Sequence, residues 1–139
     1  MVMERPSWNS IWSDFAKIIS QRSYDPRFKV GAVIVTDDNT QVLAVGYNGN
    51  HRGGKNVVES EEPGKSGFIH AENNALIKMD YNNPKGKKMY VTLSPCLACA
   101  KLILNAAIDE VFYLEDYRDS SGIDLLREFG VKVEKVGAE

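Results

Sequence analysis

The spacing of apolar residues predicts a helix and two strands in the first third of the chain. Apolar side chains recur every three or four residues over 7–21, which is typical of an amphipathic helix, and Ser7 is suited to cap its start. Runs rich in β-branched residues at 30–36 and 41–47 predict antiparallel strands joined by a polar hairpin turn at 37–40. We expect the apolar face of the helix to lie in the core: Trp8, Ile11, Trp12, Phe15, Ile18 and Ile19.

After an irregular stretch at 46–67, the chain alternates helices with strands. Helical spacing at 70–79, 97–106 and 121–129 alternates with short apolar runs at 88–93, 110–115 and 131–136. Such a series implies parallel strands with helices packed on both faces of the sheet. The predicted fold is α/β, a three-layer α/β/α sandwich around a mixed five-stranded sheet, built by one domain that spans residues 1–139. We expect these helices to bury Ala71, Ala75, Leu76, Met79, Leu102, Ile103, Ala106, Leu125, Leu126 and Phe129.

Composition and charge narrow the class of protein. The chain is 43% hydrophobic and 26% charged, as in ordinary globular proteins, and its formal net charge of −2 gives no overall attraction to nucleic acids. No apolar run approaches the about 20 residues that span a bilayer, and the N-terminal segment 1–6 contains no apolar signal-peptide region. We therefore expect a cytoplasmic protein with no membrane or nucleic-acid partner, whose cysteines remain reduced.

The candidate chemistry lies in two short blocks, His-Ala-Glu at 70–72 and Pro-Cys-Leu-Ala-Cys at 95–99, which hold both cysteines of the chain and one of its two histidines. One imidazole and two thiolates suit Zn²⁺, and three protein ligands leave the fourth position of a catalytic site to water. Glu72 follows His70 by two residues, so its carboxylate can take a proton from such a water and pass it on. We predict one catalytic zinc held by His70, Cys96 and Cys99, with Glu72 as the proton shuttle.

Three other interpretations of these blocks stay open at this point. A Cys-x-x-Cys pair also occurs as a redox motif of the thioredoxin kind. A structural zinc site would need a fourth ligand, which His51 could supply. A catalytically silent zinc-containing module that binds nucleotides is the non-enzymatic alternative, although the presence of Glu72 and an open zinc position speak against it.

Together, the blocks H-x-E and P-C-x-x-C are typical of zinc deaminases, and the chain resembles the cytidine/deoxycytidylate deaminase superfamily over nearly its whole length. Further blocks resemble its deoxycytidylate (dCMP) branch: Asp-Pro-Arg at 25–27, Gly-Tyr-Asn-Gly at 46–49 and the region of Tyr117. The resemblance implies a cytidine-deaminase-like fold and hydrolysis of dCMP to dUMP and ammonia in pyrimidine deoxynucleotide metabolism. The tRNA adenosine deaminases share the two blocks, but they hold a polyanion, and the chain after residue 120 is not basic.

The resemblance also implies roles for single residues and for the assembly. Asn48 would contact the nucleotide sugar, and backbone groups near Ala71 would hold the pyrimidine carbonyl. The family is commonly homo-oligomeric, often hexameric, and is often regulated by dCTP and dTTP. Some relatives bind a second zinc between the Gly-Tyr-Asn-Gly and His-Ala-Glu blocks, where this chain has only His51, so a single zinc is expected.

The 5′-phosphate of dCMP needs hydrogen-bond donors to replace its water. Arg27 and Lys29 precede the first predicted strand, and Tyr117 and Arg118 follow the strand at 110–115, where a parallel sheet opens into a binding crevice. We count these four residues and Ser94, at the start of the cysteine block, as expected substrate contacts. The glycine-rich stretch at 46–67, with His51, Arg52 and Lys55, is a hypothetical site for the phosphates of an effector.

Overall fold

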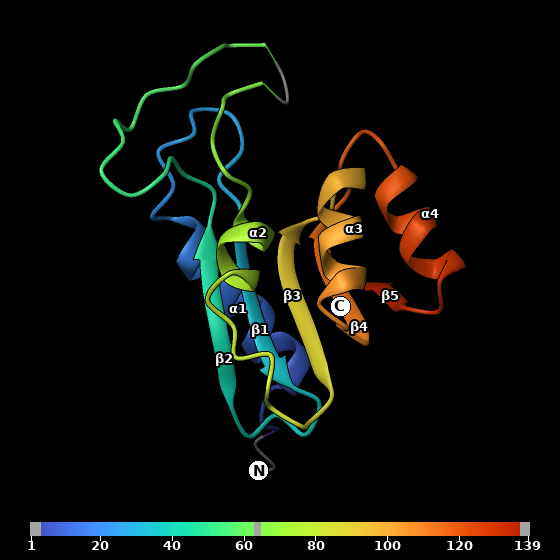
Figure 1. Ribbon diagram of the computed structural model, residues 1–139. Helices are drawn as coiled ribbons and strands as arrows, with labels where there is room; N and C mark the ends of the chain where they lie inside the picture. Colours follow the sequence, from blue (N-terminus) through green and yellow to red (C-terminus); the bar gives the residue numbers. More distant parts are fainter. Residues whose placement is uncertain (1–3, 63–64, 137–139) are drawn as a thin grey trace.

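A mixed five-stranded sheet forms the centre of the molecule (Figure 1). The computed structural model describes residues 4–62 and 65–136, so parts of the N-terminal segment and of the long loop considered above lie outside the described residues. The strand order is β2-β1-β3-β4-β5; β1 is antiparallel to β2 and β3, whereas β3, β4 and β5 are parallel. The elements are α1 (Trp8–Ser20), β1 (Gly31–Thr36), β2 (Val42–Tyr47), α2 (Ala71–Leu76), β3 (Lys87–Leu93), α3 (Leu97–Asn105), β4 (Glu110–Glu115), α4 (Ser121–Glu128) and β5 (Lys132–Lys135).

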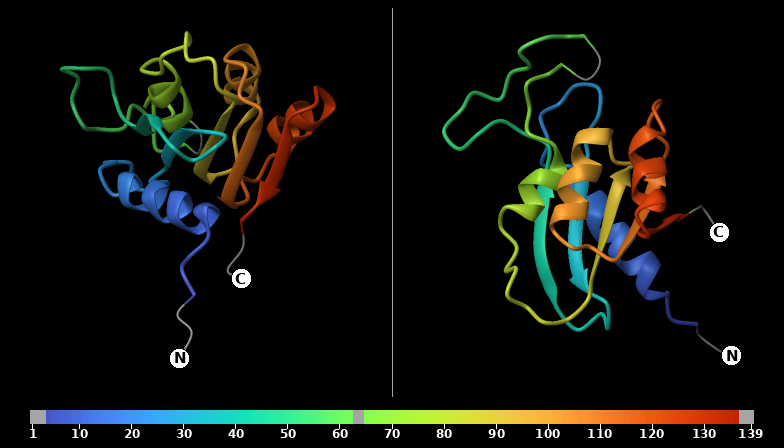
Figure 2. Two further views of the ribbon diagram at one scale, coloured as in Figure 1. Left: turned by 90° about the horizontal axis from the view of Figure 1, so that it is seen from below. Right: turned by 45° about the vertical axis from the view of Figure 1, so that its right-hand side comes forward.

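Helices cover both faces of this sheet, which confirms the predicted three layers. Figure 2 shows α1 on one face and α2, α3 and α4 on the other. The larger apolar cluster lies under the three helices, and a smaller one under α1 joins Trp12 and Ala16 to Val33, Tyr90 and Phe112. Each strand boundary lies within one residue of its predicted position. None of the helices in the described parts of the chain is long and apolar enough to cross a membrane.

The first helix buries a narrower stripe than its sequence predicts. Ser7 caps the helix as expected, its hydroxyl accepting a hydrogen bond from the Ser10 N–H at 3.1 Å. The core prediction is wrong for three side chains, Trp8, Ile11 and Ile18, which are exposed. Because α1 is the single helix on its face among the described residues, nothing described covers its outer side.

Two other helices also differ from the prediction. The helix expected at 70–79 ends after Leu76, because the next turn tightens to bonds between residues three apart, such as the Met79 N–H to the Leu76 carbonyl. Met79 nevertheless stays buried. Leu102 of α3 and Phe129, at the end of α4, are exposed rather than packed in the core.

Candidate metal centre and its cavity

The starts of α2 and α3 bring the two sequence blocks together at the carboxyl end of β3. His70 caps α2 and is held in place by the preceding residue, since Ile69 and Gly49 exchange backbone hydrogen bonds of 2.8 and 3.0 Å. Cys96 caps α3 directly after β3, and Cys99 lies in the first turn of that helix. Their ligand atoms lie within 4.8 Å of one another, and His70 is exposed, Cys96 half-buried and Cys99 buried.

The geometry of this cluster fits a tetrahedral zinc ion. The Nδ1 atom of His70 lies 3.2 Å from Cys99 Sγ and 3.5 Å from Cys96 Sγ. Ligands of a tetrahedral zinc, with bonds of about 2.0 Å to nitrogen and about 2.3 Å to sulfur, stand about 3.6 Å apart. Within residues 4–62 and 65–136 this is the one group of three ligating side chains, and His51 is not part of it.

The two thiols of the cluster have pKa values shifted in opposite directions. A hydrogen bond from the Cys99 thiol, followed by one from His70, lowers the pKa of Cys96 to about 4. The same contact between the thiols, together with burial, raises the pKa of Cys99. A metal ion that binds both sulfur atoms as thiolates must therefore displace the proton that this environment favours on Cys99.

Glu72 lies beside the ligands, two residues after His70. It is the second residue of α2 and is buried, with 4% of its surface exposed. Burial is the largest cause that raises the pKa of its carboxyl group. A carboxylate with a raised pKa holds a proton more readily, as a group that accepts and returns protons must.

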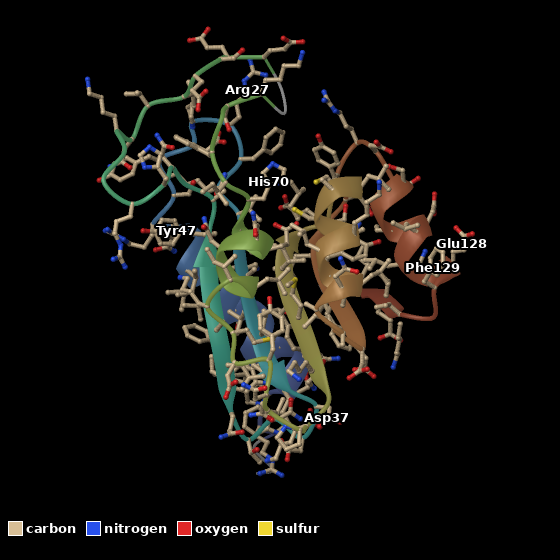
Figure 3. All side chains as sticks on the ribbon, in the orientation of Figure 1. Arg27, Asp37, Tyr47, His70, Glu128 and Phe129 are labelled. Carbon is tan, nitrogen blue, oxygen red and sulfur yellow. The ribbon has the colours of Figure 1, made fainter. Side chains whose placement is uncertain are left out.

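A cavity of about 500 Å³ opens above the metal cluster, a volume in the range of small-molecule sites. His70 and Arg27 both line it, and Figure 3 shows His70 near the start of α2 and Arg27 further out, toward the tips of the loops. Most expected substrate residues line it, namely Arg27, Asn48, Ala71, Ser94 and Tyr117, together with Glu72. Lys29 and Arg118 do not: Lys29 lines a neighbouring cavity, and the Arg118 guanidinium lies 5.7 Å from the centre of the Tyr117 ring.

The amide of Asn48 is largely occupied by the protein itself. Its Oδ1 accepts a hydrogen bond from the Val30 N–H at 2.9 Å, and its Nδ2 donates to the Phe28 carbonyl at 2.7 Å and to Asp25 Oδ2 at 3.4 Å. Asp25 in turn accepts bonds from the N–H groups of Arg27 and Phe28. Asn48 and Asp25 therefore hold the segment 25–30, the wall of the cavity that carries Arg27.

Ser94 has a similar positioning function on the opposite side of β3. Its hydroxyl accepts a hydrogen bond from the Tyr117 N–H at 2.7 Å, and its own N–H donates to the Glu115 carbonyl at 2.9 Å. These two bonds join the carboxyl ends of β3 and β4. The side chain of Ser94 is buried, so its main effect is to set where Tyr117 enters the cavity.

The match of the chain to a known family model shows that the cysteines and the histidine form a zinc site. Residues 6–115 match the model described as the cytidine and deoxycytidylate deaminase zinc-binding region, and this range holds His70, Glu72, Cys96 and Cys99. The chain belongs to this family. Zinc, the cofactor predicted from the sequence, is thereby confirmed, and a thioredoxin-like redox role for the two cysteines is set aside.

Several known proteins are similar to the chain over most of its length. The ComE operon protein 2 of Bacillus subtilis is 37% identical over 141 residues, covering 96% of this chain and 74% of that protein. The deoxycytidylate deaminase of Homo sapiens is 38% identical over 122 residues, covering 81% and 68%. The crystal structure of dCMP deaminase from the cyanophage S-TIM5 in complex with dCMP and dUMP is 36% identical, with a TM-score of 0.84, and covers 96% of this chain and 100% of that chain.

Several side chains that complete the cavity were not predicted from the sequence. Asp25 lies in the Asp-Pro-Arg block but was not assigned to the site, and Phe28 and Phe68 supply apolar walls. Glu61 and Glu62 line the cavity from the long loop. These residues come from irregular segments, where no periodic pattern indicates which way a side chain points. Two signals were available: Asp25 belongs to the Asp-Pro-Arg block, and Phe68 stands two residues before His70.

Proposed function

We propose that this protein is a zinc-dependent hydrolase that deaminates dCMP to dUMP and ammonia in pyrimidine deoxynucleotide metabolism. The observation that carries the proposal is the position of the buried Glu72 carboxylate beside the zinc cluster, at the base of a cavity of nucleotide size. The similarity to a dCMP deaminase that was crystallised with dCMP and dUMP supports this choice of substrate.

Glu72 carries the proton transfers of the proposed reaction. Zinc, when bound by His70, Cys96 and Cys99, lowers the pKa of water and so supplies a nucleophile near neutral pH. Glu72 would take one proton from the attacking water and deliver it to N3 of the cytosine ring, which makes C4 electrophilic, so that the oxygen of this water forms a bond to C4. The same carboxylate would then take the proton of the new C4 hydroxyl group and pass it to the amine; the C4–N bond breaks, ammonia leaves, and C4 becomes the carbonyl carbon of uracil. The burial of Glu72 keeps bulk water from competing for these protons.

The other lining residues orient the nucleotide. Backbone groups at Ala71, the fully buried residue between His70 and Glu72, hold the pyrimidine carbonyl. Asn48 keeps one lone pair on Oδ1 with which it can accept a bond from a sugar hydroxyl, in addition to holding the 25–30 segment. Ser94 contributes indirectly, because its hydroxyl accepts the hydrogen bond that positions Tyr117. Such positioning raises the effective concentration of the reacting groups.

We assign the 5′-phosphate to Arg27 and Tyr117. Arg27 is the single Arg or Lys side chain among the described residues that line the cavity, and the Tyr117 phenol can donate to a phosphate oxygen. Arg118 acts through the ring of Tyr117, on which its guanidinium packs. Lys29 is left out of the phosphate site because it faces the neighbouring cavity.

The same proposal covers the assembly, location and regulation of the protein. The protein forms one deaminase domain, and it assembles in the cytoplasm as a homo-oligomer, in the proposed form a hexamer. The exposed apolar side chains of α1, Trp8, Ile11 and Ile18, support a buried contact between subunits. Regulation by dCTP and dTTP uses the 46–67 stretch, where Arg52 and Lys55 are exposed and can meet phosphates.

A substrate panel tests the proposed function. The zinc-loaded protein is incubated with dCMP, dCTP, deoxycytidine and an RNA hairpin that carries adenosine, and released ammonia is measured. We expect dCMP to give the highest catalytic efficiency. Higher efficiency with deoxycytidine or with the RNA would contradict the assignment, and no ammonia from any substrate would favour a non-catalytic nucleotide-binding module.

A further inference from the structure

A second cavity lies behind the wall of the catalytic one. Its volume is about 400 Å³, and it is bounded by α1, by the segment 25–30 and by the ends of β3 and β4. Three cations, Lys17, Arg27 and Lys29, line it. Among the described residues, none of the three makes an ion pair within 4.0 Å of a carboxylate.

Polar and apolar groups in this cavity suit a ligand with two parts. Thr92 contributes a hydroxyl group that accepts one hydrogen bond, from the Gly31 N–H, and can still donate its own proton, whereas the Ser20 hydroxyl already donates to the Lys17 carbonyl. Phe28, Leu93 and Leu114 provide apolar surface beside the cations. This combination fits a phosphorylated organic molecule: the cations and the Thr92 hydroxyl take the phosphate, and the apolar side takes the carbon skeleton.

Two carboxylates face the same cavity and set a limit on its affinity for anions. Asp25 is engaged, since its oxygens accept hydrogen bonds from the N–H groups of Arg27 and Phe28 and from Asn48. Glu115, at the end of β4, is exposed and opposes an anion directly. Three cations against two carboxylates leave a net positive charge of one.

The two cavities share a wall. Asp25, Pro26, Arg27, Phe28 and Val30 line both of them. The hydrogen bonds of the Asn48 amide to Val30 and Phe28 hold this segment at both faces. A ligand that draws Arg27 toward the second cavity therefore removes it from the catalytic one.

We propose that the second cavity binds a phosphorylated small molecule, and that its occupation weakens dCMP binding by drawing Arg27 away from the catalytic cavity. The first part concerns binding alone; the second part rests on the proposed function. Lys17 and Lys29 are specific to this site, because they line the second cavity and do not line the catalytic one.

Calorimetric titration of the zinc-loaded full chain with inorganic pyrophosphate at low salt tests the binding site. Lys17→Ala and Lys29→Ala should each weaken binding about tenfold, since each removes a charge-assisted contact. Glu115→Gln should strengthen binding a few-fold, because it removes the opposing charge. Lys101→Ala, an exposed lysine on α3 that lines neither cavity, is the matched control and should leave binding unchanged.

No measurable binding to the parent chain at millimolar pyrophosphate would overturn the site, as would binding that ignores both lysines and Glu115. The coupling is tested separately, through the KM for dCMP with and without pyrophosphate. We expect a higher KM in the parent chain and little change in Lys17→Ala; an equal increase in both would place pyrophosphate in the catalytic cavity and overturn the coupling. Failure of dCMP turnover altogether would leave the calorimetric result intact, so the two proposals fail separately.

Discussion

Single side chains around the cavity divide into two kinds. Glu72 and Arg27 project groups toward a ligand, whereas Asn48 and Ser94 use most of their polar atoms to hold backbone in place. The sequence pattern identified all four, but it assigned all four to contact or chemistry. It could not separate these functions, because Asn48 reaches a carbonyl and an N–H that lie 18 to 20 residues away in the chain.

Replacement of Glu72 by glutamine keeps the shape of the side chain and removes its ability to accept a proton. We expect turnover of dCMP to fall at least about a hundredfold, in the range that general acid–base catalysis contributes. Zinc content, measured by elemental analysis, should be unchanged because Glu72 is not a ligand. Glu61→Gln, which alters another carboxylate of the same cavity, is the control and should stay near the parent rate. Glu72→Gln activity within a few-fold of the parent would refute the proton-shuttle role.

Replacement of Arg27 by alanine tests the phosphate contact. Loss of a charge-assisted hydrogen bond should lower the catalytic efficiency for dCMP about ten- to a hundredfold and leave the residual rate on deoxycytidine nearly unchanged. Tyr117→Phe should act in the same direction and more weakly. Arg22→Ala removes an exposed arginine near the end of α1 that lines neither cavity, and serves as control. If neither the Arg27 nor the Tyr117 variant loses its preference for dCMP, the phosphate binds elsewhere.

The positions of helices and strands were predicted better than the burial of their side chains. Period-2 and period-3.6 patterns fix which residues share a face, so strand positions and the order of elements were confirmed. The pattern does not show how much of the apolar face of a helix is buried by neighbouring elements. Because no second helix lies beside α1 on its face of the described sheet, Trp8 and Ile18 are exposed. The catalytic cavity lies mostly in irregular segments, where no periodicity exists to read.

The close packing of α2 on β2 gives a prediction for Gly46. A Cβ atom at this position would lie 2.5 Å from the Ala71 carbonyl oxygen and 2.6 Å from the Ala75 nitrogen, both backbone atoms of α2. Gly46→Ala should therefore displace the start of α2, lower the melting temperature by several degrees and reduce activity, since His70 and Glu72 flank Ala71. Gly49→Ala, where the nearest atom is a Tyr47 ring carbon at 3.6 Å, is the matched control for thermal unfolding and dCMP turnover. Equal melting temperatures for the two variants would contradict this prediction, because they would show that α2 can move without loss of stability.

For the molecule as a whole, zinc joins the starts of two neighbouring helices, α2 and α3, which lie on the same face of the sheet. Its ligands come from the starts of α2 and α3, so binding free energy adds to the free energy of unfolding. Removal of zinc with a chelator should lower the melting temperature by several degrees, and added zinc should restore it. Cys99→Ala should melt at the low temperature regardless of added zinc. An identical melting curve with and without the metal would contradict a role of the ion in stability.

The position of β3 has a consequence for how the protein is made. This strand lies between β1 and β4, and it separates His70, which precedes it, from both cysteines, which follow it. Because a chain emerges from the ribosome from its N-terminus, the histidine and Glu72 are synthesised before either thiol. A nascent chain that ends before residue 95 has the imidazole but no sulfur ligand, and it cannot form the complete site. The full set of ligands therefore exists only after the central strand, which joins the antiparallel and parallel halves of the sheet, has been synthesised.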